Sequence, residues 1–274
     1  MEKENQQSDR FGIADHYRSV AKDYDNFYQA RNEAMVPVIL KYFDDVEPDH
    51  VVVDIGSGTG FFGERIFEAR QLKNAIWCVD PSPEMQAVAK QRKGVYAVTK
   101  TAEEFVADFK VDQLFDKVSI IASFHHFSRP IEVLKGLRAH LQPGGEVLVV
   151  IDGDSSTGSG LPHFAKAEEI FRDTTQQCTK ESISAVFRQA DFKVEVSEEK
   201  IMWIVKKSLW YEMLRGRFYS TLSELSDEEI EDGIVELEMG KFKSLSPHDD
   251  VRIPFPFHVF RATKPAAKST EPTP

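Results

Sequence analysis

Residues 51–64 of this 274-residue chain read VVVDIGSGTGFFGE. An apolar run interrupted by Asp54 comes first, four glycines follow within eight positions, and a helix-forming stretch continues from there. A short apolar run that ends at a glycine is typical of a buried parallel strand. These residues therefore predict a strand, a tight glycine turn and a helix.

Two glycine patterns overlap in this turn, and they imply different ligands. The frame from Gly58, G-T-G-F-F-G, fits the dinucleotide pattern, but it leaves Gly56 and Ser57 inside an overlong turn. The frame from Asp54 ends the strand on a carboxylate, which would repel a pyrophosphate and suits a cationic ligand. In that frame Gly63 is a packing residue inside the helix. We therefore favour the frame from Asp54.

Predicted strands and helices alternate along the rest of the chain. This alternation predicts an α/β fold with a doubly wound, seven-stranded, mostly parallel sheet between helices, and ligands of such sheets bind at the carboxyl ends of strands. The predicted strands are 51–55, 75–80, 95–100, 117–123, 146–152, 193–205 and an antiparallel one at 255–264. The predicted helices are 61–70, 82–93, 130–141 and 181–192, and a loop is predicted at 152–162.

Composition limits the classes of partner. The formal net charge of -11 argues against binding to a nucleic-acid backbone. Cys78 and Cys178 show no paired spacing, so neither a disulfide framework nor a zinc site is predicted. The first residues lack the apolar core of a signal peptide, and no apolar run approaches the ~20 residues that span a bilayer. We expect a cytoplasmic protein without nucleic-acid or membrane partners.

Several motifs resemble those of one family. DIGSGTG looks like the first motif of the class I S-adenosylmethionine-dependent methyltransferases, and Asp80 in WCVDPSPEM resembles the acidic residue that holds the ribose hydroxyls there. SFHHF is similar to the motif that faces the methyl group, and residues 11–31 are similar to the N-terminal helix of the small-molecule branch. The resemblance implies a Rossmann-like methyltransferase fold and S-adenosyl-L-methionine as cofactor.

The resemblance also implies the residues of the site. Asp54 and the glycine turn would hold the methionine end of the cofactor, and Glu103 would approach the adenine amino group. The cofactor-binding residues expected are Tyr24, Asp54, Gly56, Ser57, Gly58, Gly60, Asp80, Pro81, Met85, Thr101, Ala102, Glu103 and Ser123. The acceptor-binding residues expected are Tyr17, Arg31, Trp210, Tyr211, Arg215 and Arg217.

The domain is expected to cover residues 11–264, with disordered termini at 1–10 and 265–274 and a substrate cap at 206–250. Within the cap, Ser226 and Glu229 have the spacing of a capping box that opens a helix. Arg215 and Arg217 would diverge on a helix, so at most one of them is expected to face an anionic acceptor. The cap is therefore predicted to select the acceptor.

His126 and His125 are the candidate catalytic residues, because an imidazole titrates near neutral pH and can take a proton from a nucleophile. They can equally be wall or hydrogen-bonding residues, because a sulfonium methyl is already activated and positioning can supply the rate. Adjacent histidines without further ligands do not predict a metal site.

The sequence thus predicts a methyltransferase that uses S-adenosylmethionine to modify an oxygen or nitrogen of a small molecule, with carboxylates among the candidate acceptors. No N-P-P-Y signature follows the fourth strand, which disfavours amino groups of macromolecules. The alternative is a non-catalytic partner or regulatory protein that binds the same cofactor. A third hypothesis, an NAD-dependent oxidoreductase, depends on the disfavoured glycine frame.

Overall fold

The computed structural model describes residues 21, 23–108, 114–152, 164–175 and 179–264. Tyr17, Cys178 and the predicted termini 1–10 and 265–274 lie outside these residues, as does the predicted loop at 152–162 apart from Asp152. Among the described residues, no helix is long and apolar enough to cross a membrane.

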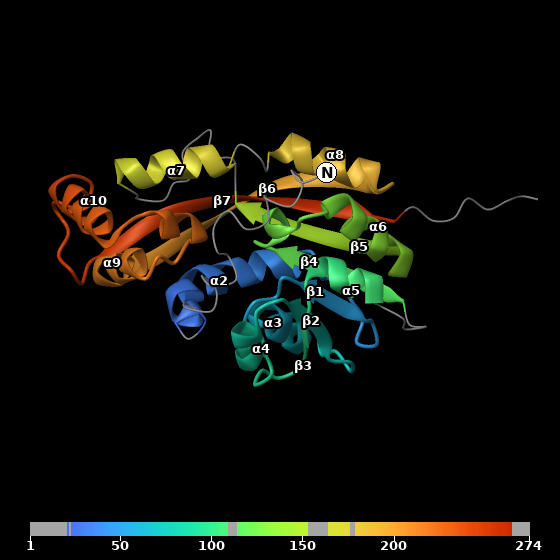
Figure 1. Ribbon diagram of the computed structural model, residues 1–274. Coiled ribbons are helices and arrows are strands. Elements are labelled where there is room, and N and C mark those ends of the chain that lie inside the picture. The colour runs from blue at the N-terminus through green and yellow to red at the C-terminus, as the bar shows by residue number, and fades with distance from the viewer. Residues whose placement is uncertain (1–20, 22, 109–113, 153–163, 176–178, 265–274) are drawn as a thin grey trace, which may run out of the picture.

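Seven strands form one sheet in the order β3-β2-β1-β4-β5-β7-β6 (Figure 1). β7 runs antiparallel to both of its neighbours, and the other pairings are parallel, so the predicted fold class is confirmed. The strands are β1 (Val52–Ile55), β2 (Ile76–Asp80), β3 (Val95–Thr99), β4 (Phe115–Ile121), β5 (Leu141–Asp152), β6 (Lys193–Lys206) and β7 (Asp250–Thr263).

Helices cover both faces of the sheet, because successive residues of a strand point to opposite faces and the inner strands are apolar on both (Figure 1). One core packs the sheet against α2 (Tyr24–Lys41) and α3 (Phe61–Arg70). The other packs it against α5 (Ala102–Asp108), α6 (Pro130–His140) and α8 (Lys180–Gln189). The remaining described helices are α4 (Pro83–Ala89), η1 (Phe124–His126), α7 (Ala165–Thr175), α9 (Lys207–Arg215), η3 (Ser220–Glu224) and α10 (Asp227–Met239).

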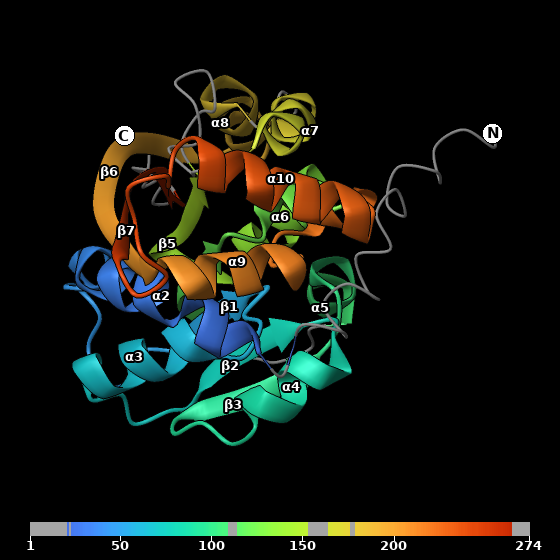
Figure 2. The ribbon, with the colours of Figure 1, turned by 90° about the vertical axis from the view of Figure 1, so that its left-hand side faces the viewer.

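The segment between β6 and β7 folds as helices where β6 ends and β7 begins. This end of the two strands is on the left in Figure 1 and faces the viewer in Figure 2. Trp203 on β6 packs against Trp210 on α9 and against Phe218, and all three side chains are fully buried. The predicted capping box is confirmed, because Ser226 and Glu229 bond each other's backbone at the start of α10. The role of this segment as a substrate cap stays a prediction.

Two predicted strand boundaries were wrong. β5 begins at Leu141, which was assigned to the preceding helix, and not at the predicted position 146. β7 begins at Asp250, before the predicted position 255, and pairs along the whole of β6, through Pro254 and Pro256. Prolines are tolerated on edge strands, and β5 pairs with β7 only from Phe257 onward, so both prolines lie where one side of β7 has no strand partner.

Gly63 on α3 offers a direct test of how the helix packs on the sheet. A Cβ at this position would lie 2.6 Å from Sγ of Cys78 on β2. We predict that Gly63→Ala lowers the free energy of unfolding by about 1–3 kcal/mol through overpacking, although alanine gains up to about 1 kcal/mol of helix propensity.

The matched control is Ala69→Gly, the reverse exchange at an exposed position of the same helix. It should cost about 1 kcal/mol, from propensity alone. Urea unfolding of both variants measures the difference. A stabilised Gly63→Ala protein would contradict the packing role.

Candidate functional site

A pocket lies between α2 and the carboxyl end of β1. β1 pairs with β2 on one side and β4 on the other, so the pocket is at the point where the strand order reverses, where ligands of such sheets bind. The pocket is lined by Tyr24, Arg31, Asn32, Asp54, Gly56, Ser57, Gly58, Thr59, Phe61, Phe62, Ile121 and Ala122.

The glycine turn, residues 56–60, has the conformation that the frame from Asp54 requires. Gly56, Gly58 and Gly60 have φ angles of 67°, 54° and 73°, in the left-handed region that favours glycine. A Cβ on Gly56 would lie 2.3 Å from the side chain of Ser123, whose hydroxyl donates to the carbonyl of Ile55 at 3.0 Å. The absence of a side chain on Gly56 therefore lets the segment after β4 approach the turn.

Asp54 is the most perturbed carboxyl of the pocket. It is 2% exposed, and its one hydrogen-bond donor among the described residues is the hydroxyl of Ser119, at 2.7 Å. Burial raises the pKa of Asp54 to about 7, and nearby Asp80 adds to this while Ser119 opposes it. A buried carboxylate is destabilised until it meets a cation, so this site favours a positively charged ligand group.

Ser119 was missed by the sequence analysis, and it comes from the neighbouring strand. Asp54 on β1 stands opposite Ser119 on β4 in the parallel register. The signal available was the hydroxyl of Ser119 in the middle of the buried run KVSII, because a buried hydroxyl needs a hydrogen-bond partner.

Asp80, at the end of β2, is fixed by two backbone donors. Its carboxylate accepts from the amides of Gly58 at 3.0 Å and Ser82 at 2.9 Å. Burial raises its pKa and these two bonds lower it. Ser82 also caps α4 by accepting from the amide of Met85. The carboxylate is thus held beside the glycine turn, with lone pairs left for further donors.

Arg31 on α2 is a buried cation without a carboxylate partner. It is 4% exposed, and its guanidinium donates twice to Oδ1 of Asn32, at 3.2 and 3.0 Å, and lies 4.3 Å from the centre of the Tyr28 ring. Within the described part of the chain, no carboxylate forms an ion pair with it. Burial lowers its pKa, but nearby Tyr219 and other groups raise it overall, so it stays charged. The position suits an anionic ligand group.

The segment after β4 contributes to the pocket through Ile121 and Ala122, and Ala122 has a φ of 54°, unusual for a residue other than glycine. His125 and His126 follow on η1 with their ring centres 3.9 Å apart, and they are not among the lining residues. The side chain of His125 is exposed at the surface. Desolvation by the surrounding protein lowers the pKa of His125, and the negative charge of Asp152 raises it by a smaller amount.

Residues predicted around the adenine form hydrogen bonds that stabilise the starts of helices. Thr101 and Glu104 form a reciprocal capping pair at the start of α5, with bonds of 2.9 and 3.1 Å. Glu103 accepts from the amides of Ser128 and Arg129, which orders the entry to α6. Ala102 and Met85 are buried, whereas Pro81 is exposed. Contact of these residues with the cofactor stays a prediction.

The structure does not bring the predicted cap residues to this pocket. Trp210 is fully buried in the core, and the hydroxyl of Tyr211 donates to Glu238 at 2.5 Å. Arg215 donates to both carboxylate oxygens of Glu231, at 2.6 and 2.9 Å. Arg217 donates to Asp227 at 2.6 Å. Both arginines thus pair with acidic side chains of α10, and contact of either one with an acceptor stays a prediction.

Comparisons with known proteins agree with this geometry. Residues 53–147 match the family model described as a methyltransferase domain. A ubiquinone/menaquinone biosynthesis C-methyltransferase of Cupriavidus pinatubonensis is 26% identical over 145 residues, which are 50% of this chain and 59% of that protein. The chain thus matches only about half the length of its curated relatives.

Two solved structures share the fold. The YcgJ protein of Bacillus subtilis has a TM-score of 0.55 at 18% identity, covering 85% of this chain and 98% of that one. Phosphoethanolamine N-methyltransferase 2 of Haemonchus contortus, in complex with S-adenosyl-L-methionine, has a TM-score of 0.52 at 22% identity, covering 84% and 52%. The family match places a methyltransferase domain in residues 53–147, and the strand order and the solved structures show that the chain has the methyltransferase fold.

The raised pKa of Asp54 predicts how stability depends on pH. Its folded pKa of about 7 exceeds the ordinary value of 3.8, so the stability that protonated Asp54 contributes is fully present below pH 3.8 and is lost as pH rises through 7. Asp54→Asn is neutral throughout. At about pH 8 and without ligand, the variant should be more stable than wild type by up to about 4 kcal/mol.

Urea unfolding at several pH values between about 4 and 8 measures this difference, which should vanish at the acid end. Asp116→Asn serves as a control, because this carboxylate lies at the opposite end of the sheet and accepts from the amide of Val51. A difference between wild type and Asp54→Asn that does not change with pH would refute the assignment.

Proposed function

We propose that the protein transfers the methyl group of S-adenosylmethionine to a small-molecule acceptor. The observation that carries this proposal is the pair of carboxylates, buried Asp54 and partly buried Asp80, on either side of a glycine turn with three left-handed glycines. Carboxylates in these positions oppose a pyrophosphate and match the ammonium and the ribose hydroxyls of the methyl donor.

The charges of the pocket fit the methionine end of this cofactor. An amino acid carries both an ammonium and a carboxylate, and Asp54 and Arg31 line the same pocket with opposite charges. We therefore assign Arg31 to the carboxylate of the cofactor, in place of the acceptor contact expected from the sequence. Asp80 would hold the ribose hydroxyls.

The cofactor supplies an already activated sulfonium methyl, so the chain's own work is to position and desolvate the reactants. Tyr24, Phe61 and Phe62 give the pocket an aromatic wall. An acceptor that arrives protonated would need a base, and His126 or His125 on η1 is the candidate. A carboxylate acceptor would need none.

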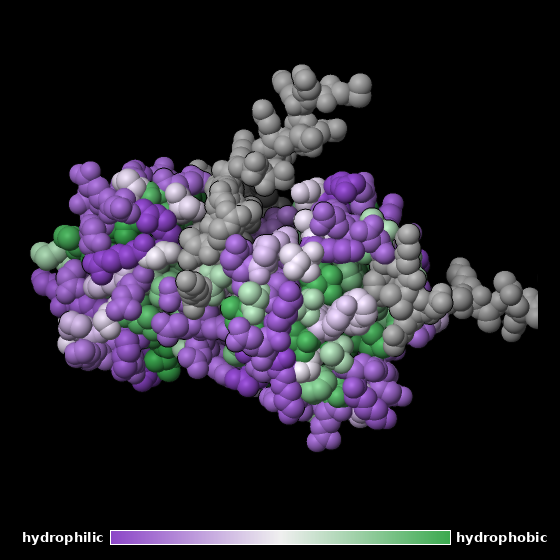
Figure 3. All heavy atoms as spheres, turned by 60° about the horizontal axis from the view of Figure 1, so that its bottom comes forward, coloured by the Kyte–Doolittle hydropathy of each residue, from purple (hydrophilic) through white to green (hydrophobic). Residues whose placement is uncertain are grey.

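A small acceptor is favoured over a nucleic acid by the charge of the surface. Polar side chains cover most of the face in Figure 3, with hydrophobic residues in scattered groups. The acidic net charge would repel a phosphate backbone. We propose an oxygen or nitrogen of a small metabolite as the atom that is methylated.

Ligand binding and turnover test the proposed function together. S-adenosylmethionine at a hundred times its Kd should stabilise the protein by ~2.7 kcal/mol, and NADH should not. Asp80→Asn should weaken donor binding at least about tenfold, because charge-assisted hydrogen bonds contribute about 1.5–3 kcal/mol each. Thermal unfolding and calorimetry measure both effects.

Incubation of the protein with methyl-labelled donor and a small-molecule extract, followed by mass spectrometry, then identifies labelled products. Stabilisation by NADH alone would overturn the cofactor assignment. Donor binding without any labelled product would favour the non-catalytic alternative.

The assignment of Arg31 has a separate test that uses decarboxylated S-adenosylmethionine, which keeps the ammonium and the sulfonium. Wild type should prefer the intact donor by at least about tenfold, from the charge-assisted bonds to its carboxylate. Arg31→Met keeps an apolar stem beside Tyr28, and it should lose this preference. Calorimetry with both ligands measures the ratio of the two Kd values.

Asp54→Asn is the matched comparison, because losing a contact with the ammonium should weaken both ligands by the same factor and keep the preference. An Arg31→Met protein that still prefers the intact donor would return Arg31 to the acceptor.

A further inference from the structure

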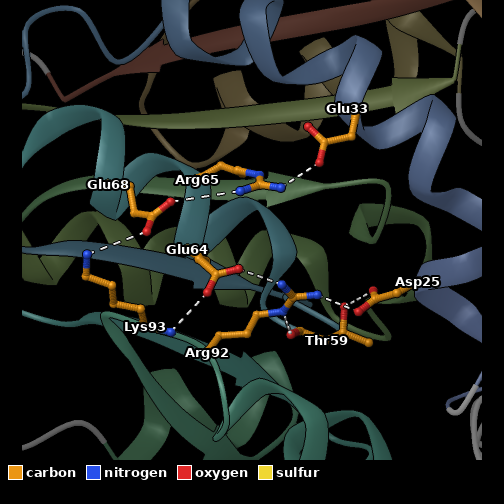
Figure 4. A network of polar contacts seen from close by, with 8 residues as sticks. All are labelled: Asp25, Glu33, Thr59, Glu64, Arg65, Glu68, Arg92 and Lys93. Atoms are coloured by element: carbon orange, nitrogen blue, oxygen red, sulfur yellow. Dashed lines mark hydrogen bonds and ion pairs between the residues drawn. The ribbon is translucent and has the colours of Figure 1, made fainter.

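Arg92 joins three parts of the molecule that meet at the pocket (Figure 4). It lies in the turn between α4 and β3, and each nitrogen of its guanidinium has a different partner. Nε donates to the carbonyl of Thr59 in the glycine turn at 2.7 Å, and Nη1 donates to Glu64 on α3 at 2.6 Å. Nη2 pairs with Asp25 in the first turn of α2. The side chain is 16% exposed, so solvent screens it only partly.

Thr59 completes the link between α2 and the glycine turn. Its hydroxyl donates to Oδ1 of Asp25 at 2.6 Å, while its carbonyl accepts from Arg92. One carboxylate of α2 is therefore held by both a cation and a hydroxyl. Asp25 directly follows Tyr24, and both Tyr24 and Thr59 line the pocket. The position of Asp25 thus determines where Tyr24 lies relative to the turn.

The residue before α2 adds no capping hydrogen bond to this link. Asp23 occupies the N-cap position, and its side chain makes no capping hydrogen bond. Further along α2, Glu33 pairs with Arg65 of α3 at 2.5 Å. Among the described residues, Arg65 pairs with Glu33 and Glu68 and with no residue of the glycine turn, so the Glu33 pair joins α2 to α3 without touching the turn.

We propose that Arg92 is a positioning residue of the cofactor site: it fixes the start of α2, and with it Tyr24, against the glycine turn. The inference rests on the proposed function, because it assigns this arrangement to cofactor binding. A lysine cannot replace the arginine, because one ammonium cannot reach three partners in the directions that a planar guanidinium serves.

The test measures the Kd of S-adenosylhomocysteine, the demethylated cofactor, which has no net charge at neutral pH. Arg92→Met should weaken binding at least about fivefold, and Arg92→Lys should be close to it, because the loss of about 1 kcal/mol of fixed geometry corresponds to that factor. Asp25→Asn keeps an acceptor for Thr59 and loses the ion pair, so it should weaken binding similarly.

The double variant of Arg92→Met and Asp25→Asn should bind no more weakly than the weaker single variant, because both changes break one link. Wild-type affinity should fall with added salt, and this dependence should be smaller in Arg92→Met. A general loss of stability would produce neither the non-additive double variant nor the smaller salt dependence. The control is Glu33→Gln, which breaks the other ion pair between α2 and α3 and should leave the Kd within about twofold.

Each outcome has a distinct meaning. Wild type that fails to bind S-adenosylhomocysteine would overturn the proposed function. Wild type that binds while Arg92→Met and Asp25→Asn bind equally well would overturn only the positioning role. Equal losses in Asp25→Asn and Glu33→Gln would also overturn it, because any anchor of α2 would then suffice. If Arg92→Met fails to fold, Asp25→Asn and its salt dependence decide the question.

Discussion

The burial of Asp54 is the constraint on which the rest of the site depends. This carboxylate, near the end of a central strand, loses most of its hydration, and the one hydrogen bond from Ser119 offsets little of the cost in free energy. The chain tolerates this because β1 and β4 are held by their own ladder and by apolar layers on both faces of the sheet. The ionised form of Asp54 is therefore destabilised in the folded protein, and a cationic ligand group beside it would stabilise it.

Arg31 shows the same principle with the opposite sign. Its guanidinium is surrounded by tyrosines and an amide and has no carboxylate partner among the described residues, although a protein of net charge -11 has many acidic groups to offer. Elsewhere in the described chain, acidic side chains do pair with arginines: Glu231 and Asp227 of α10 pair with Arg215 and Arg217. The contrast indicates that Asp54 and Arg31, two groups of opposite charge, line one pocket without forming an ion pair among the described residues, which suits a zwitterionic ligand.

Local signals made the strand, turn and helix around Asp54 predictable, because glycine spacing and hydrophobic periodicity act within a few residues. The capping box of Ser226 and the packing role of Gly63 were read from the same local rules. Ser119 and Arg92 were not found, because their roles arise from register and from contacts across the fold. The acceptor role expected of Arg215 depended on which helix would lie beside it, and no pattern within its own segment carries that information.

The cap segment leaves the sheet and returns to it at one place. Lys206 and Asp250 stand opposite each other at the end of the β6–β7 ladder and form an ion pair of 2.6 Å, so residues 207–249 form a closed excursion between two adjacent backbone positions. Such an excursion can change in length or sequence without shifting the register of any strand. Residues 207–249 are thereby separated from the strands that carry Asp54 and Asp80, so a change within this excursion can leave the chemistry of the pocket as it is.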